Sequence, residues 1–312
     1  VEFSLQINNE DLQKQMRNEN VERVTIAVTI PDEVINNDKI ELNQILLDSE
    51  LLKTAGEEKK DISVVIKDES GKERCSWSFR GEELAASQNS FEDINLAMSV
   101  ERVSEWNDQM SQELGGCGLV LNFKHEGLLP APAQVRVYVG DIIGEESGSG
   151  IDVNKKVYLY YYNAATGKLE SLPYSSGYRV DKDGYITIDL VHCSDYVILP
   201  KAAGKSILTP IKDQITITVD RKTLSTKGIK KTAQIQVQLP STLELVGSLD
   251  DKTSSDSIGA VIVSYESSND KVTKVDSNGK ITAIGKGKAT ITVTFTLYSG
   301  KTKTYKITIA VK

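Results

Sequence analysis

Residues 265–293 read YESSNDKVTKVDSNGKITAIGKGKATITV, and this stretch decides the fold of the C-terminal part of the chain. Asn278-Gly279 stands between two short runs that alternate apolar and polar residues. This pair predicts a tight hairpin, because such a turn requires positive φ. Ile291, Val293 and Phe295 recur at every second position, which places them on one face of the following strand. The stretch therefore predicts antiparallel β-structure with one buried face.

The order of signals in this stretch also resembles a known family. A Ser-Ser-Asn turn at 267–269 precedes a Val-x-x-Val strand at 272–275, the Asx-Gly hairpin and a Gly-x-Gly-x-Ala-x-Ile corner at 285–291. Bacterial immunoglobulin-like domains of group 2 repeat this pattern, and the resemblance extends over about residues 210–312. It implies an immunoglobulin-like sandwich in a surface protein, because the family occurs in intimin- and invasin-like adhesins as a stalk or spacer. The polar insertion at 249–259 departs from the pattern and is expected to be an exposed loop.

A second resemblance concerns residues 157–200, with their Tyr-Leu-Tyr-Tyr-Tyr-Asn run and Ser-Asp-Tyr-Val-Ile-Leu ending. They are similar to segments that precede such modules in Gram-positive surface proteins, which implies an extracellular, cell-surface or wall-associated location. The signal peptide and the wall anchor would then have been trimmed from this chain. No apolar run reaches the ~20 residues that a membrane-spanning helix needs.

The first two thirds of the chain also read as β-structure, since period-2 alternation of β-branched and aromatic residues recurs between Gly, Asn and Asp turns. Strands are predicted at 3–7, 24–30, 62–67, 75–79, 96–103, 119–124, 135–139, 157–162, 178–180, 185–190 and 196–199, with hairpin loops at 68–72 and 181–184. Short helices are predicted at 10–19, at 44–53 after a cap at Asn43, and at 104–114. The predicted fold class is mainly β, with tandem β-sandwich domains and one to three short helices in the N-terminal region.

A stretch of small residues at 201–209 coincides with a change in the sign of the charge. Residues 1–205 hold 21 Lys and Arg against 35 Asp and Glu, a net charge of -14, and residues 206–312 hold 16 against 9, a net charge of +7. We predict a mainly-β region at 1–205, either one domain or two lobes divided near 104–118, and the immunoglobulin-like domain at 206–312. The acidic first region argues against nucleic acid as a partner.

Few residues offer catalytic chemistry. The chain has two histidines, His125 and His192, and three scattered cysteines, which are interpreted as small buried residues. His192 and Cys193 are adjacent on a predicted strand and would point to opposite faces, so they cannot act as base and nucleophile. The spacings of zinc, calcium and nucleotide motifs do not occur. We predict no enzymatic activity, no cofactor and no metal site.

One aromatic row offers a candidate binding site. Tyr158, Tyr160 and Tyr162 would share one face of a strand, and an exposed row of rings can hold a sugar. The alternative is that the rings turn into the core and keep only the hydroxyl groups at its edge.

The expected function is that of a non-enzymatic surface fragment, a spacer and adhesion module that presents the N-terminal region. Its partner would be a cell-wall polymer or a host or extracellular glycan or protein. The basic tail would be attracted to anionic envelope polymers. The alternative is a carbohydrate-binding appendage of a larger extracellular glycan-processing enzyme.

Overall fold

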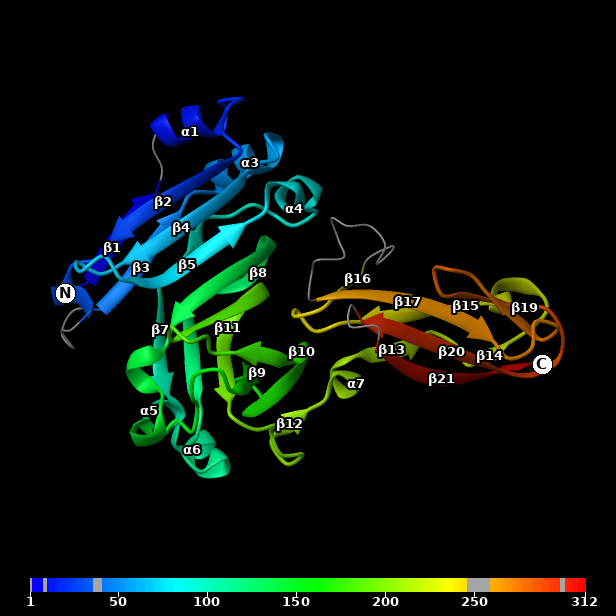
Figure 1. The fold of residues 1–312 in the computed structure, drawn as a ribbon. Helices are drawn as coiled ribbons and strands as arrows, with labels where there is room; N and C mark the ends of the chain where they lie inside the picture. The colour runs from blue at the N-terminus through cyan, green and yellow to red at the C-terminus, as the bar shows by residue number, and fades with distance from the viewer. Residues whose placement is uncertain (1, 8–9, 36–40, 246–258, 298–300) are drawn as a thin grey trace. The chain divides into compact units, whose positions relative to one another are not determined.

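The computed structural model describes residues 2–7, 10–35, 41–245, 259–297 and 301–312 (Figure 1). The chain forms two compact units, Val1–Thr209 and Pro210–Lys312. The polar insertion expected at 249–259 lies, except for its last residue, outside the described residues. Strands dominate both units, so the mainly β fold class is confirmed.

A nine-stranded sheet organises the first unit. Its strands follow the order β12-β10-β9-β11-β8-β5-β4-β2, and β7 pairs with β8 as a branch. All described pairs are antiparallel except β2–β4 and β10–β12. The strands are β2 (Arg23–Thr29), β4 (Asp61–Lys67), β5 (Glu73–Phe79), β7 (Met98–Arg102), β8 (Leu119–Tyr138), β9 (Lys156–Asn163), β10 (Lys168–Arg179), β11 (Tyr185–Leu199) and β12 (Leu208–Thr209).

The long ribbon of β8 and β11 connects two groups of strands (Figure 1). Residues 133–137 of β8 pair with β5, whereas residues 119–123 pair with β7. Between these parts the register with β11 shifts twice, on either side of the pairs His192–Leu128 and Cys193–Gly127. Such shifts bend a ribbon. The predicted strands 119–124 and 135–139 are therefore two parts of one bent strand, as are 185–190 and 196–199.

A three-stranded sheet of β1 (Glu2–Ile7), β3 (Glu41–Leu47) and β6 (Ile94–Asn95) contributes to the same core as the large sheet. Here one prediction was wrong: residues 44–47 belong to strand β3, parallel to β1. Helix α3 (Ser49–Glu57) begins only after Asp48, whose side chain accepts a hydrogen bond from the Glu50 N–H. Asp48, and not Asn43, is therefore the N-cap.

The remaining helices of the first unit are short. They are α1 (Glu10–Met16), α2 (Asp32–Ile35), α4 (Gly81–Ala86), α5 (Val103–Trp106) and α6 (Asp108–Leu114), with 3-10 turns η1 (Gly140–Ile142) and η2 (Glu145–Ser147). The predicted helices at 10–19 and 104–114 correspond to α1 and to the pair α5–α6. Helices α2 and α4 were not predicted, so the described part of this unit has more short helices than the expected one to three.

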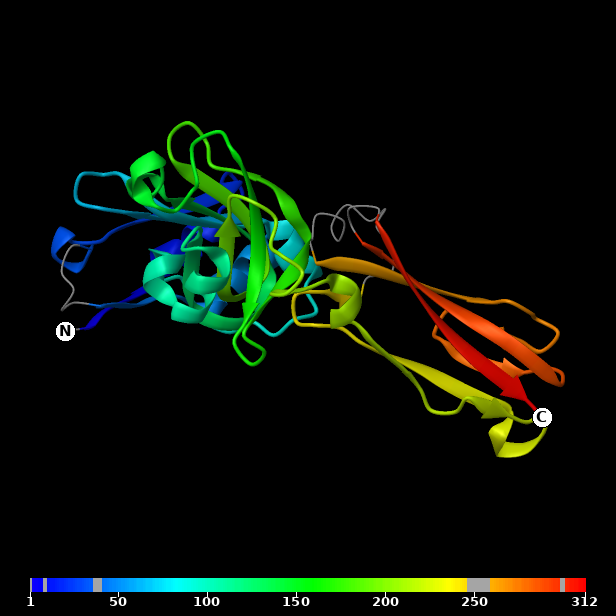
Figure 2. The same ribbon diagram turned by 90° about the horizontal axis from the view of Figure 1, so that it is seen from below.

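The second unit is a sandwich of two sheets. Figure 2 shows β13 and β15 in yellow on one side and the orange-to-red strands β17, β20 and β21 on the other. One sheet holds β13 (Thr216–Val219), β15 (Thr232–Gln238), β19 (Lys280–Ala283) and β18 (Thr273–Val275). The other holds β14 (Thr223–Leu224), β21 (Thr302–Val311), β20 (Gly287–Leu297), β17 (Ala260–Ser267) and β16 (Glu244–Leu245), and the short helices are α7 (Ile211–Gln214) and η3 (Gly228–Lys231).

The turn predicted at Asn278-Gly279 joins β18 to β19. Gly279 has a φ of +74°, and Asp276 accepts hydrogen bonds at 2.9 Å from the backbone N–H groups of Asn278 and Lys280. Ile291, Val293 and Phe295 are fully buried between the sheets, as their alternation predicted. These local signals explain why this unit could be predicted from its sequence.

Candidate functional site

The first unit contains a pocket of about 510 Å³. Its floor is the end of the large sheet, with Ile66 on β4, Cys75 on β5 and Val137 on β8. The rest of the apolar lining comes from Ile30, Val34 and Leu42, from Met98 and Val100 on β7, and from Val139 and Ile142. Pockets of 300–1,000 Å³ with mainly apolar walls and a few polar groups are typical of ligand sites.

Charged side chains surround this pocket. Arg74, Glu101, Lys124 and Asp141 line it, together with Ser99 and Tyr138. On one side, Asp141 accepts the Tyr138 hydroxyl at 3.1 Å and pairs with Arg74 at 3.1 Å and with Lys72 at 3.9 Å. On the other side, Asn122 donates to Glu101 at 2.7 Å. The lining of the pocket therefore combines apolar and charged side chains.

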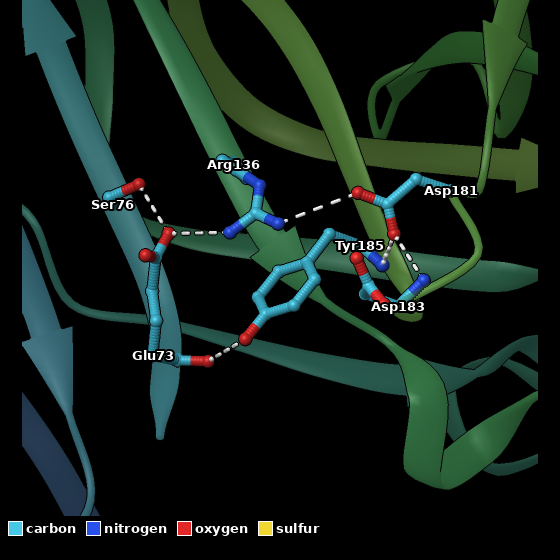
Figure 3. A network of polar contacts seen from close by, with 6 residues as sticks. All are labelled: Glu73, Ser76, Arg136, Asp181, Asp183 and Tyr185. Atoms are coloured by element: carbon cyan, nitrogen blue, oxygen red, sulfur yellow. Dashed lines mark hydrogen bonds and ion pairs between the residues drawn. The ribbon is translucent and has the colours of Figure 1, made fainter. Parts of the chain in front are cut away.

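A network of polar contacts connects β5, β8 and the start of β11 next to the pocket (Figure 3). Arg136 on β8 reaches Glu73 on β5 at 3.2 Å and Asp181 before β11 at 3.4 Å, and its guanidinium lies 3.5 Å from the centre of the Tyr185 ring. Partial burial by itself would lower the pKa of Arg136. The hydrogen bond and the charge of Glu73, together with the charge of Asp181, outweigh burial and raise this pKa. Tyr185 in turn donates its hydroxyl to the Glu73 carbonyl at 3.0 Å.

The predicted plain turn at 181–184 is part of this network. Asp181 accepts the backbone N–H groups of Asp183 and Tyr185, each at 2.9 Å. Burial works against ionisation, but these two bonds and Arg136 lower the pKa of Asp181. The carboxylate of Asp181 therefore stabilises the turn through two backbone N–H groups and also pairs with Arg136 in the network.

We expect Arg136→Ala to destabilise the first unit by roughly 1–2 kcal/mol, because it removes two partly exposed ion pairs and a cation–π contact. Arg136→Lys keeps the charge and loses the planar fork, so its effect should be intermediate. Urea unfolding of the full chain, followed by tryptophan fluorescence, measures both, since the two tryptophans, Trp77 and Trp106, lie in the first unit. Equal midpoints for all three proteins would show that the network contributes no stability.

The three tyrosines of the predicted aromatic row do share one face, but that face is covered. Tyr160 is 3% exposed and its hydroxyl accepts the Ala203 N–H at 3.1 Å. Tyr158 and Tyr162 are half-buried in the same apolar cluster, and the ring of Tyr162 meets that of Trp106 on α5 at 4.7 Å. Tyr160 therefore presents no exposed ring, and Tyr158 and Tyr162 expose only part of theirs. The strand alternation was right, and the cover by α5, α6 and residues 203–208 decides the burial.

His192 and Cys193 are both buried, at 9% and 0% exposure. Burial raises the pKa of the Cys193 thiol well above its ordinary value, so the thiolate that a nucleophile needs is disfavoured. His192 Nδ1 has no hydrogen-bond partner among the described residues, and its ring packs edge-on against Tyr161 at 5.8 Å. The two residues act as packing groups where the ribbon of β8 and β11 bends.

The histidines give the first unit a pH-dependent stability. Burial lowers the pKa of His192, with a contribution from the charge of His125, and burial likewise lowers the pKa of His125. Their contribution to stability is thus complete above the unfolded pKa of ~6.5 and is lost as the pH falls through the lower folded values. We expect the first unit to melt at a lower temperature at pH 5.5 than at pH 8.

The double variant His125→Gln/His192→Gln contains no histidine. Its melting temperature, followed by tryptophan fluorescence, should change less between pH 8 and pH 5.5 than that of the wild type. An unchanged pH dependence in the double variant would assign the effect to other groups. Asp195 works in the opposite direction, because burial raises its pKa, and it is present in both proteins.

The pocket residues were not predicted from the sequence. They come from seven separate segments between Ile30 and Ile142, and no short motif connects them. The only local signal is the charged sequence Lys72-Glu73-Arg74 next to Cys75, which is equally typical of an exposed strand end.

Comparison with known families concerns the second unit. The family model described as "Intimin, immunoglobulin-like domain" matches residues 253–296, which include β17, β18, β19 and almost all of β20. The match supports the bacterial immunoglobulin-like domain that the sequence predicts for this part of the chain. The matched family is that of intimin, and the match does not extend to the group 2 assignment or to a Gram-positive source.

Two solved structures are similar to part of the chain. One is titled "Crystal structure of EHEC O157:H7 intimin mutant", with 19% identity, a TM-score of 0.19 and coverage of 31% of this chain and 47% of that chain. The other is titled "Crystal structure of intimin-Tir90 complex", with 18% identity, a TM-score of 0.19 and coverage of 32% and 47%. The alignments thus span about half the length of those chains, and at this TM-score they assign no function. No curated protein matches the chain significantly.

Within the described ranges, none of the helices combines the length and apolar character needed to cross a membrane. The same residues contain no group of three or more His, Cys, Asp or Glu side chains placed to hold a metal ion.

Proposed function

We propose that the chain is a non-enzymatic adhesion module of a bacterial surface protein, in which the second unit is a spacer and the first unit is presented to a partner outside the cell. The match of residues 253–296 to the intimin immunoglobulin-like family carries this proposal. Intimin domains of this kind belong to a cell-surface adhesin. The group 2 assignment, a Gram-positive envelope and an extracellular location stay predictions.

The chemistry of the first unit supports a binding role over a catalytic one. Its one adjacent histidine–cysteine pair, His192 and Cys193, is buried in the bend of a ribbon. The alternative of a carbohydrate-binding appendage loses its main support, because the aromatic row on β9 lies under α5 and α6. The first unit, with a net charge of -14, favours cationic partners, whereas the second unit, with a net charge of +7, favours anionic ones.

The proposal can be tested with beads that carry the full chain, attached through its C-terminus. They are applied to an array of extracellular matrix proteins, host glycans and anionic cell-wall polymers. We expect selective retention on one extracellular macromolecule at ~0.15 M salt, where the Debye length is about 8 Å. Retention only on anionic polymer, and only at low salt, would indicate a wall-binding spacer instead. Turnover of ester, peptide or glycoside substrates by the full chain would contradict the non-enzymatic assignment.

A further inference from the structure

We propose that the 510 Å³ pocket of the first unit binds a small amphipathic carboxylate, with an alkyl chain inside the pocket and its carboxylate beside Arg74. This inference is independent of the adhesive role, because it rests on the pocket alone.

The side chains that line the pocket favour a ligand with a large apolar part. Ten of the lining residues are aliphatic or sulfur-containing, namely Ile30, Val34, Leu42, Ile66, Cys75, Met98, Val100, Val137, Val139 and Ile142. The sulfur atoms of Cys75 and Met98 lie 3.4 Å apart and add a polarisable surface. Water beside these ten side chains finds few hydrogen-bond partners, so the apolar part of a ligand replaces it favourably there.

The size of the pocket sets the length of the ligand. At ~30 Å³ for each water molecule, 510 Å³ corresponds to roughly 17 waters. A ligand on the order of fifteen non-hydrogen atoms fills this space, which is the size of a medium-chain fatty acid.

The pocket is built on rigid elements. Its floor is formed by β4, β5 and β8, which are joined by antiparallel pairing with one register shift, between Ile66 and Lys67 of β4. The network around Arg136 fixes the same end of β5 and β8, next to Arg74 and Tyr138. A floor held in this way does not collapse to close the cavity, so a ligand meets a largely pre-formed site.

The charges favour an anionic head group. Lys72 and Arg74 share one carboxylate, Asp141, and Lys124 and Glu101 also line the pocket. The four charged side chains of the lining, Arg74, Lys124, Glu101 and Asp141, sum to zero, and Lys72, which lies outside the lining, gives the group around the pocket an excess of one positive charge. A monovalent carboxylate beside Arg74 would balance it and would make a charge-assisted hydrogen bond to the guanidinium.

The test is calorimetric titration of the full chain with octanoate, decanoate and dodecanoate below their micellar concentrations, and with the matching alcohols. We expect the affinity for the acids to rise about fourfold for each added methylene, which corresponds to ~0.8 kcal/mol. Each acid should bind more tightly than the alcohol of equal length. Arg74→Gln should weaken binding of the acids and leave the alcohols unchanged, and higher salt should have the same selective effect.

Val100→Trp, which fills the pocket from β7, should weaken decanoate binding more than tenfold. Ile142→Trp fills it from the other side and replaces this variant if Val100→Trp does not fold, as judged by its melting curve. Val153→Trp is the matched control, since Val153 is 38% exposed and lies outside the pocket. Absence of saturable binding by the wild type, or binding that survives both pocket variants, would overturn the proposal. Equal affinity for acids and alcohols would overturn the head-group assignment.

Discussion

Replacing Trp77 with alanine is expected to destabilise the first unit by about 3–5 kcal/mol, because a large aromatic side chain would leave a cavity in the core. Trp77 is fully buried on β5, stacks on Phe79 at 6.5 Å and meets the edge of Phe123 at 5.4 Å. For a unit of this size, each kcal/mol lowers the melting temperature by roughly 2–4 °C. The melting temperature of the first unit should thus fall by about 6–20 °C.

The measurement is a thermal melt of the full chain, followed by the fluorescence of the remaining Trp106 on α5. Trp77→Phe is the matched control, since it keeps a ring at the centre of the cluster and should cost less than half as much. A loss below 1 kcal/mol for Trp77→Ala would mean that the sheet is not packed around this side chain as described.

The parts of the fold that could be predicted from the sequence are those set by neighbouring residues. The hairpin between β18 and β19 needs only Asp276 as a hydrogen-bond acceptor and Gly279 at positive φ, and both lie within five residues. The alternation in β20 is likewise a local pattern that survives folding, because one face of this strand meets the opposite sheet.

Distant contacts explain the errors. Residues 44–47 fit a helical stripe and a strand equally well, and pairing with β1 decides for the strand. The face of β9 that carries Tyr160 is buried by helices that lie some fifty residues earlier in the chain. The pocket could not be predicted for the same reason, since its lining comes from elements between Ile30 and Ile142 that only the folded sheet brings together.

Phe295→Ala is expected to destabilise the second unit by about 3–5 kcal/mol while the melting of the first unit is unchanged. Phe295 is fully buried between the two sheets, and its ring meets that of Tyr305 on β21 at 5.6 Å. For a domain of ~100 residues, each kcal/mol lowers the melting temperature by about 4–8 °C, so the shift should be at least ~12 °C. Differential scanning calorimetry of the full chain measures it, and tryptophan fluorescence identifies the transition of the first unit.

The comparison of Phe295→Ala with Trp77→Ala tests whether the two cores are energetically separate. The two apolar clusters around these residues share no member among the described side chains, so each variant should shift one transition and leave the other in place. Phe295→Leu, which keeps most of the buried volume, should shift the same transition by a smaller amount. If Phe295→Ala lowered the tryptophan-detected transition as much as the other one, the chain would unfold as a single cooperative unit. A spacer that is independent of the part it presents would then be excluded.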